Sequence, residues 1–152
     1  MEKVMIINGP NLNLLGSRNP AVYGVETLKS LEEKLLNAGE RLRLNIECRQ
    51  TNEEGIIINW LQEAHFQGYM GVVLNAGAYT HYSYAIRDCI EAINIPVIEV
   101  HLSNIYAREE FRHHSCLAPV TAGQISGLGF HGYELAIMAI LHIKGREING
   151  EN

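Results

Sequence analysis

The amino-acid sequence predicts an α/β fold in which helices cover both faces of a parallel sheet. Short apolar segments alternate with helical patterns, and the stretches between successive apolar segments have the length of right-handed βαβ crossovers. The chain has 152 residues, which suits a single domain over residues 1–152 with a sizeable core. With 47% hydrophobic and 19% charged residues, it has an ordinary globular composition.

The chain opens with an apolar strand over residues 4–7, followed by a long connection over residues 8–24. This connection contains three Gly, two Pro and four Asn. A loop of this length in a compact domain is either functional or disordered. Disorder would leave several leucines in water, so we expect a structured lid that carries Arg18 and Tyr23.

Two helices and an edge strand follow this connection. Thr27 is placed to cap a helix with one apolar face, which ends near Gly39. Residues 43–49 alternate between apolar and polar, as expected for a strand with one wetter face near the sheet edge. Asn52 is placed to cap a second amphipathic helix, which Gly68 closes.

The second half of the chain supplies the remaining strands. Residues 71–75 are a short continuous apolar run, as in the middle of a parallel sheet, and residues 97–101 are the next strand. A helical stripe lies between these strands, and a long charged connection over residues 102–117 follows them. Residues 118–122 are a weaker strand candidate.

A final apolar helix begins at Gly132, and we expect the tail over residues 145–152 to fray. By analogy with other open α/β sheets, the predicted architecture is a flavodoxin-like three-layer fold with a five-stranded parallel sheet in the order 2-1-3-4-5. In such sheets ligands bind at the carboxyl ends of the strands, where the strand order reverses.

The formal net charge of −5 argues against nucleic acid and anionic membranes as partners. A small anionic ligand is still compatible with it, because a few convergent arginines make a locally positive pocket. The three cysteines, Cys48, Cys89 and Cys116, form no Cys-x-x-Cys pair, which suits buried thiols in a reducing cytosol. We find no signal-peptide pattern and no membrane-spanning apolar run, and therefore expect a cytoplasmic protein.

Three connections leave the carboxyl ends of predicted strands and are rich in functional side chains. They cover residues 8–24, 75–83 and 101–113, and the predicted topology brings them to one edge of the sheet. The side chains expected to converge there are Asn11, Arg18, Tyr23, Asn75, His81, His101, Ser103, Arg108 and Arg112.

Two pairs at this edge have the chemistry of proton transfer. Arg18 beside Tyr23 would favour the phenolate of a side chain whose pKa is ordinarily about 10, although the more common role of such a tyrosine is to pack the loop. Glu99 lies two residues before His101, so both side chains point to one side of the strand. A carboxylate beside an imidazole fixes its tautomer and supports the cationic, acid form, although strand histidines are also often core residues.

Two other motifs are weaker. His113 and His114 suggest a metal site, but adjacent histidines point in different directions and zinc-type spacing is missing, so we expect no metal. Residues 127–132 match the dinucleotide-binding fingerprint letter for letter. Too little chain follows them for a βαβ unit, so these glycines are predicted to shape the turn into the last helix.

Four motifs occur in order along the chain, at residues 8–24, 75–83, 99–115 and 132–136. The first begins Asn-Gly-Pro-Asn-Leu-Asn-Leu-Leu-Gly and the second is Asn-Ala-Gly-Ala-Tyr-Thr-His-Tyr-Ser. The third contains Glu-Val-His-Leu-Ser-Asn and Arg-Glu-Glu-Phe-Arg-His-His-Ser. Together they resemble the type II 3-dehydroquinate dehydratases, essentially from end to end.

This resemblance implies a cofactor-free trans elimination of water from 3-dehydroquinate, which gives 3-dehydroshikimate through an enolate in the shikimate pathway. Tyr23 matches the base that removes the proton beside the ketone, and Arg18 matches the residue that keeps this base ionised. Asn11 matches the residue that holds a water on the enolate oxygen. His101, steered by Glu99, matches the general acid that protonates the departing hydroxyl.

The resemblance also implies how the substrate is held. Asp88 matches a binding position reached from a neighbouring subunit, in a family of homododecamers built from trimers. Asn19 departs from the family pattern, which has Glu before Pro20, and we expect this to affect only lid closure or subunit contacts. The other matching binding positions are Asn75, His81, Arg112 and the backbone N–H groups of Leu102 and Ser103, with Arg108 in the same motif.

Two other hypotheses use the same edge of the sheet. A flavodoxin-like module for a nucleotide or FMN would need a phosphate cradle, and residues 8–24 are poor in hydroxyls and helix-entry glycines. A structural or regulatory oligomer with an inactive site is disfavoured because Arg18, Tyr23 and His101 are all present.

Overall fold

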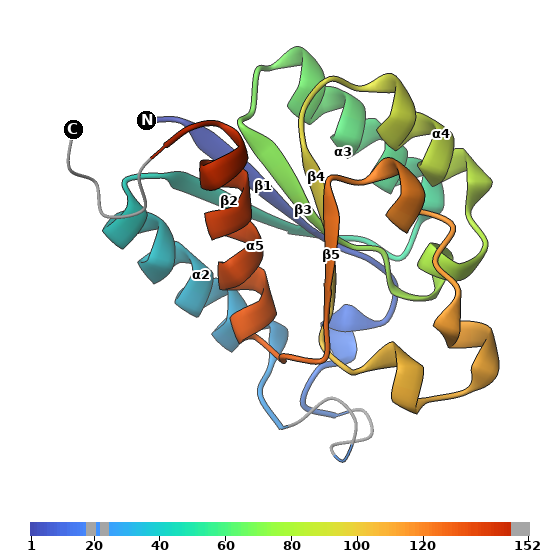
Figure 1. The fold of residues 1–152 in the computed structure, drawn as a ribbon. Helices are drawn as coiled ribbons and strands as arrows, with labels where there is room; N and C mark the ends of the chain where they lie inside the picture. Colours follow the sequence, from blue (N-terminus) through green and yellow to red (C-terminus); the bar gives the residue numbers. More distant parts are fainter. Residues whose placement is uncertain (18–20, 22–24, 147–152) are drawn as a thin grey trace.

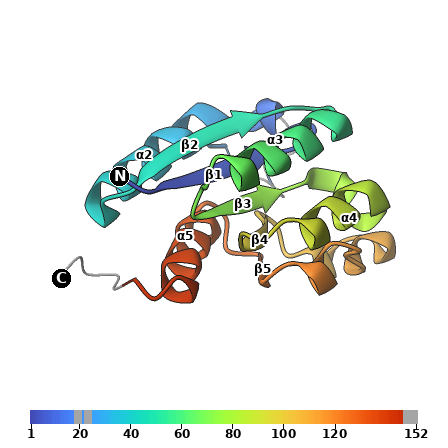
Figure 2. The ribbon, with the colours of Figure 1, turned by 90° about the horizontal axis from the view of Figure 1, so that it is seen from above.

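The computed structural model describes residues 1–17, 21 and 25–146, and its strands form one parallel sheet in the order β2-β1-β3-β4-β5. Helices α2 and α5 cover one face of this sheet, and α3 and α4 cover the other (Figures 1 and 2). The predicted three-layer fold and strand order are therefore confirmed. The strands are β1 (Lys3–Asn8), β2 (Asn45–Gln50), β3 (Gly71–Asn75), β4 (Val97–His101) and β5 (Gly123–Ser126). The helices are α2 (Leu28–Leu42), α3 (Glu54–Phe66), α4 (Tyr84–Ala92) and α5 (His131–Ile143).

The inner strands are buried almost throughout because both faces of the sheet are covered. In β1, Val4 and Ile6 pack in the core under α2 and α5, whereas Met5 and Ile7 pack in the core under α3 and α4. All four side chains are fully buried. Alternate residues of one strand thus build two apolar cores, back to back across the sheet.

Helix α2 begins where the sequence predicts. Thr27 accepts a hydrogen bond from the backbone N–H of Ser30, and the Ser30 hydroxyl accepts one from the N–H of Thr27, which makes a capping box. Gly39 lies near the end of the helix, as predicted, and the helix continues for three more residues to Leu42. Gly39 also serves packing, because a Cβ there would lie 2.5 Å from the Ile46 side chain of β2.

The predicted cap of α3 is wrong. The helix starts after Glu53, and Asn52 gives it no cap. The side-chain oxygen of Asn52 instead accepts the backbone N–H of Asn11 at 3.1 Å and the side-chain amide of Gln50 at 3.1 Å. Asn52 therefore ties the connection after β1 to the end of β2.

The strand predicted at residues 118–122 is misplaced. Ala118–Val120 forms a short 3-10 helix, η5, and β5 begins only after it. Pro119 explains the difference, because it has no N–H for a sheet ladder but fits the first turn of a helix. Beyond β5, Gly127 and Gly129 have φ values of 88° and 58° and turn the chain into α5, as predicted.

The three cysteines are unpaired, as predicted. Cys89 and Cys116 are buried and Cys48 is partly buried. Burial raises the pKa of all three thiols, that of Cys48 to about 12 with a further contribution from Glu32 and Glu47. Little reactive thiolate therefore forms at neutral pH.

Candidate active site

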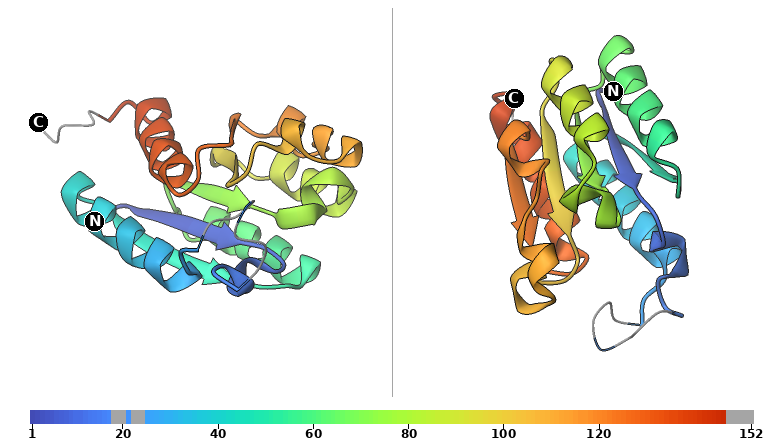
Figure 3. Two further views of the ribbon diagram at one scale, coloured as in Figure 1. Left: turned by 90° about the horizontal axis from the view of Figure 1, so that it is seen from below. Right: turned by 90° about the vertical axis from the view of Figure 1, so that its right-hand side faces the viewer.

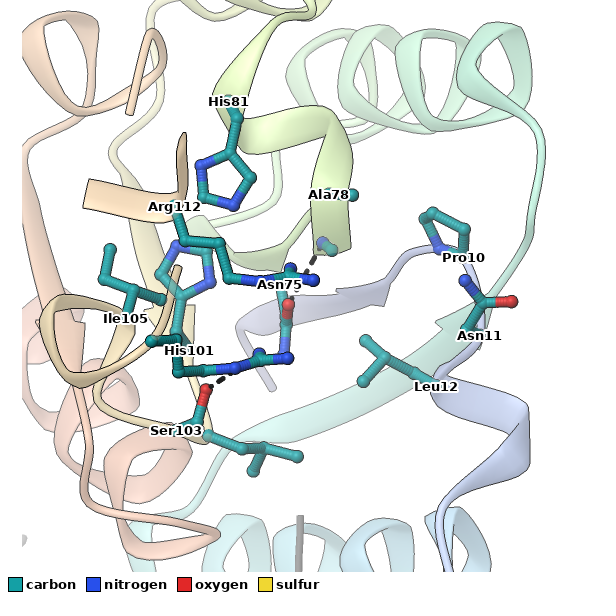
Figure 4. A pocket seen from close by; sticks show the side chains of 13 residues that line it. Pro10, Asn11, Leu12, Asn75, Ala78, His81, His101, Ser103, Ile105 and Arg112 are labelled. Atoms are coloured by element: carbon teal, nitrogen blue, oxygen red, sulfur yellow. Dashed lines mark hydrogen bonds between the residues drawn. The ribbon is translucent and has the colours of Figure 1, made fainter. Parts of the chain in front are cut away.

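A pocket of about 220 Å³ opens at the carboxyl edge of the sheet, among the connections that follow β1, β3 and β4. The left view of Figure 3 faces this edge, and Figure 4 shows the pocket from close by. The pocket lies beside the switch point between β1 and β3, where ligands of open α/β sheets bind.

The pocket brings together most of the residues predicted from the sequence. Glu99 does not line it but is fully buried and bonded to His101, and Asp88 is exposed on α4 away from it. Arg18, Asn19 and Tyr23 lie outside the described residues. The predicted residues that line the pocket are Asn11, Asn75, His81, His101, Leu102, Ser103, Arg108 and Arg112. The lining residues that the sequence did not suggest are Pro10, Leu12, Gly77, Ala78 and Ile105.

His101 and Glu99 form a buried pair at the end of β4. The Nε2 atom of His101 lies 2.6 Å from Oε2 of Glu99, and the side chains are 7% and 0% exposed. The predicted placement on one side of the strand is confirmed. With Nε2 donating to the carboxylate, Nδ1 is the ring nitrogen that can exchange a proton with a ligand.

Side chains from three segments hold the Glu99 carboxylate. The Ser115 hydroxyl donates to Oε1 at 2.7 Å, and the Gln124 amide donates to Oε2 together with His101. Burial would raise the pKa of Glu99, but these three hydrogen bonds and the charge of His101 lower the pKa below its ordinary value. Glu99 is therefore a carboxylate at neutral pH and stabilises positive charge on His101.

The sequence did not single out Ser115 or Gln124. Ser115 lies in the third motif, but nothing local marks its hydroxyl as a partner of a strand residue. Gln124 pairs with Glu99 in the register of β4 and β5. This partnership becomes visible only when the position of β5 is known, and the sequence placed that strand too early.

Two arginines bring positive charge to the pocket from the connection after β4, which contains the 3-10 helices η3 (Ile105–Ala107) and η4 (Glu110–His113). Nη1 of Arg108 donates to the Ser103 hydroxyl at 3.3 Å. Arg112 donates through Nε to Glu109. The Arg112 side chain is 18% exposed and that of Glu109 is 57% exposed, so the guanidinium lies on the pocket side and the carboxylate in solvent.

His81 lines the pocket from the 3-10 helix η2 (Gly77–His81). Its Nδ1 lies 2.8 Å from the carbonyl oxygen of His114, which only accepts, so Nδ1 carries the hydrogen. Burial and the charges of His101 and Arg112 lower the pKa of His81, against the raising effect of that carbonyl. The neutral ring therefore leaves Nε2 as an acceptor for a ligand hydroxyl.

The connection after β1 is anchored at its base to the connection after β3. The N–H of Gly9 donates to the carbonyl of Asn75 at 2.7 Å, and a Cβ on Gly9 would lie 2.8 Å from the Ala76 carbonyl. Asn11 has a left-handed backbone with φ 71°, and its N–H is held by Asn52. These contacts place Asn11 at the pocket.

Asn75 ends β3 at the pocket, and both of its side-chain polar atoms are engaged. Oδ1 accepts the N–H of Gly77 at 3.1 Å, as Figure 4 shows, and Nδ2 donates to the Tyr133 hydroxyl at 2.9 Å. That hydroxyl donates in turn to Oδ1 of Asn8 at 2.6 Å. The three side chains close the α2–α5 core beneath the pocket.

Within residues 1–17, 21 and 25–146, no group of three or more His, Cys, Asp or Glu side chains is arranged to hold a metal ion. His113 bonds through Nε2 to the Arg108 carbonyl, and His114 offers its carbonyl to His81. The adjacent histidines therefore support the geometry of the connection after β4.

A buried carboxylate–imidazole pair and two guanidinium groups at this edge define the class: a flavodoxin-like α/β protein with a pocket at the switch point of its sheet. The chain belongs to the dehydroquinase class II family, whose model matches residues 2–141. The resemblance that the four motifs suggest is thereby confirmed.

Individual relatives agree with the family. The chain is 60% identical over 141 residues to the 3-dehydroquinate dehydratase of Halalkalibacterium halodurans, covering 93% of this chain and 97% of the relative. It is 54% identical over 134 residues to the 3-dehydroquinate dehydratase of Deinococcus radiodurans, covering 88% and 94%. The crystal structure of type II dehydroquinase from Butyrivibrio crossotus is similar with a TM-score of 0.90 at 48% identity, covering 91% and 97%.

Proposed function

We propose that this chain is a type II 3-dehydroquinate dehydratase, a hydro-lyase of the shikimate pathway. The observation that carries the proposal is the buried Glu99–His101 pair, which faces a pocket with two arginines in a chain of the dehydroquinase family. The relatives named above carry the same activity in their names. The alternative, a nucleotide- or FMN-binding module, is not favoured, since Pro10, Asn11 and Leu12 line the pocket where a phosphate cradle would need small or hydroxyl residues.

The elimination needs a base, an enolate stabiliser and an acid. The base takes a proton from the carbon beside the ketone, and the C–H electron pair forms the enolate. Collapse of the enolate breaks the bond to the β-hydroxyl, which accepts a proton from His101 and leaves as water. Glu99 holds the His101 ring in place and stabilises its cation until the proton is transferred.

We assign the base to Tyr23, with Arg18 favouring its phenolate, on the strength of the first motif. A trans elimination needs the base and the acid on opposite faces of the substrate. His101 approaches from the end of β4, and Tyr23 belongs to the separate connection after β1. Asn11 lines the pocket from that same connection and is assigned to hold a water on the enolate oxygen.

The remaining pocket residues are assigned to substrate binding. Arg112 and the backbone N–H groups of Leu102 and Ser103 bind the carboxylate, and Arg108 supports Ser103. Asn75 and His81 bind substrate oxygens. Side chains, backbone groups and the water assigned to Asn11 fill every role in the elimination, so the proposed reaction uses no cofactor and no metal.

The proposal extends to assembly and location. Asp88 is exposed on α4, as a residue that reaches a neighbouring subunit's pocket in a homododecamer built from trimers must be. We propose that the chain forms one domain and acts in the cytoplasm. None of the helices in the described part of the chain is long and apolar enough to cross a membrane.

The test is to add 3-dehydroquinate to the purified protein and follow the ultraviolet absorbance of the conjugated product. We expect turnover at neutral pH that EDTA does not change, and no turnover at all would contradict the function. Tyr23→Phe should retain substrate binding and lose turnover, because it removes only the phenolic oxygen. An active Tyr23→Phe variant would reassign the base.

A further inference from the structure

A chain of three buried polar side chains runs from the pocket into the core, and of the three only Asn75 has a role in the function proposed above. Tyr133, in the first turn of α5, is fully buried and bonds Asn75 of β3 and Asn8 of β1. Asn8 and Asn75 are register partners at the carboxyl ends of their strands. The chain therefore links one helix to two strands directly under a pocket residue.

The direction of these hydrogen bonds is fixed from one end. The backbone N–H of Gly77 can only donate, so the Asn75 atom that it contacts is Oδ1, which places Nδ2 toward Tyr133. Because Nδ2 donates, the Tyr133 oxygen accepts, and its own hydrogen goes to Oδ1 of Asn8 at 2.6 Å. Reversing the Asn75 amide would set its Nδ2 against the Gly77 N–H, and reversing the Asn8 amide would leave the Tyr133 hydrogen without an acceptor.

One hydrogen of the Asn75 amide remains for a ligand. Nδ2 carries two hydrogens, of which Tyr133 accepts one, and Asn75 lines the pocket. We propose that Tyr133, assisted by Asn8, is a positioning residue that locks the Asn75 carboxamide with its N–H presented to the substrate. At the position that Asn75 faces, the pocket then selects a substrate oxygen that accepts a hydrogen bond. For the identity of the substrate this inference rests on the proposed function.

Two further observations agree. Burial raises the pKa of Tyr133, so its hydroxyl keeps the hydrogen that the chain requires. The Nδ2 atom of Asn8 is buried and has no partner among the described residues. An apolar residue at position 8 would avoid this unpaired amide. The presence of asparagine there is therefore explained by its Oδ1, which accepts the hydrogen bond from the Tyr133 hydroxyl.

The test compares the kinetics of Tyr133→Phe with those of the wild-type enzyme. The variant keeps the ring in the core but removes the acceptor for Nδ2 of Asn75, so the carboxamide loses one of its two anchors and keeps only the hydrogen bond from the Gly77 N–H. We expect KM to rise about 10-fold, as for a lost hydrogen bond in a dry site, while kcat stays within about threefold. An unchanged KM would overturn the inference.

Two controls separate positioning from loss of stability. Ile137→Val trims a fully buried side chain one turn further along α5 without touching the polar chain, and should leave KM unchanged. In an Asn75→Ala background, Tyr133→Phe should produce no further rise in KM, because no carboxamide remains to be oriented. A similar KM rise in Ile137→Val, or an undiminished effect of Tyr133→Phe in Asn75→Ala, would show a merely structural role.

A second variant and a substrate-free measurement cover the remaining cases. Asn8→Leu removes the acceptor of the Tyr133 hydroxyl and should raise KM less than Tyr133→Phe does. It replaces Tyr133→Phe as the test if Tyr133→Phe does not fold. In protein with ¹⁵N-labelled asparagine, the Asn75 side-chain N–H should exchange about 10-fold faster in either variant. Unchanged exchange would refute the locking even if the wild-type protein failed to dehydrate 3-dehydroquinate, so the two failures are distinguishable.

Discussion

Strand β4 and the connection that follows it, residues 102–117, are neighbours in sequence but differ in regularity and in how much of their surface meets solvent. All five residues of β4 are buried, and the strand is paired on both sides, with β3 and β5. The connection contains the short 3-10 helices η3 and η4, and its Tyr106 and Phe111 are 58% and 59% exposed. The strand holds the acid pair and the connection holds the arginines.

The difference shows how two adjacent segments take different roles, with proton transfer in the strand and anion binding in the connection. Proton transfer needs a fixed, dry geometry, and Glu99 has it because three hydrogen bonds offset the cost of burying its charge. Capture of an anion from water needs accessible charge, and Arg112 keeps its exposed partner Glu109 at little energetic cost. Changes in β4 should therefore alter kcat, and changes in the connection should alter KM.

The largest expected effect is that of His101→Ala. Removing the acid should lower kcat by about 10²- to 10⁴-fold with a much smaller change in KM, because the arginines remain. Steady-state kinetics on 3-dehydroquinate measure both constants. His142→Ala, an exposed histidine at the end of α5, is the matched control and should behave as the wild type. A large rise in KM with kcat preserved would refute the assignment of the acid.

Arg112→Ala should have the converse effect. Loss of a charge-assisted hydrogen bond to the substrate carboxylate should raise KM by about 10- to 100-fold, with kcat nearly unchanged. Arg112→Lys should fall between, because it keeps the charge and loses the planar fork. Arg41→Ala, which removes an exposed arginine paired with Glu134, controls for net charge. If kcat fell while KM stayed constant, the division between strand and connection would be wrong.

Ser115→Ala joins the two regions, because Ser115 belongs to the connection and its hydroxyl bonds Glu99 of β4. With one lowering contribution removed, the pKa of Glu99 should rise toward the value that burial alone would give. Glu99 stabilises the fold above its ordinary pKa and loses this contribution as the pH falls through its native-state pKa. Both acid unfolding and the acidic limb of the kcat/KM profile should therefore move to higher pH.

The matched control for this shift is Thr121→Val. Its hydroxyl donates to the Ala118 carbonyl and does not touch Glu99, so its profiles should keep the wild-type position. Urea unfolding across acidic pH measures the stability profile, and initial rates over the same range measure the acidic limb of the kcat/KM profile. Equal shifts in both variants would mean that the effect comes from a general change in this part of the chain, and would contradict a role for Ser115 in lowering the pKa of Glu99.

The smallest effect is expected for Thr27→Ala, which lies in neither region. Loss of the capping box should lower the free energy of unfolding by about 1 kcal/mol and leave kcat and KM unchanged. Urea denaturation measures the first and kinetics the second. The variant shows how much activity follows from stability alone, and a shift in either kinetic constant would mean that the start of α2 is coupled to the pocket.

The sheet could be predicted because its determinants are local. The continuous apolar run at residues 71–75 identified the inner strand β3, and the alternation over residues 43–49 identified β2 at the edge. The errors arose where a residue has two plausible local uses. Asn52 resembles a helix cap but bonds Asn11 from a distant segment, and Pro119 lies in an apolar stretch that its ring excludes from the sheet.

The site divides in the same way. The Glu99–His101 pair could be predicted because residues two apart on a strand share a side, which is local geometry. Tyr133 could not, since it meets Asn8 across 125 positions of sequence and no periodicity marks such a contact. The contact of Gln124 with Glu99 could not be predicted, because the sequence placed the fifth strand too early. The roles of Arg18 and Tyr23 stay predictions from the motif.

The unreactive cysteines have a practical consequence for chemical labelling. Because burial keeps all three thiols protonated at neutral pH, the native chain offers little background to maleimides or iodoacetamides. A single cysteine introduced at exposed Phe111 would then be the dominant labelling position. A fluorophore attached there lies next to Arg112, and its emission would report ligand binding. Phe111 is the one native residue that such labelling replaces.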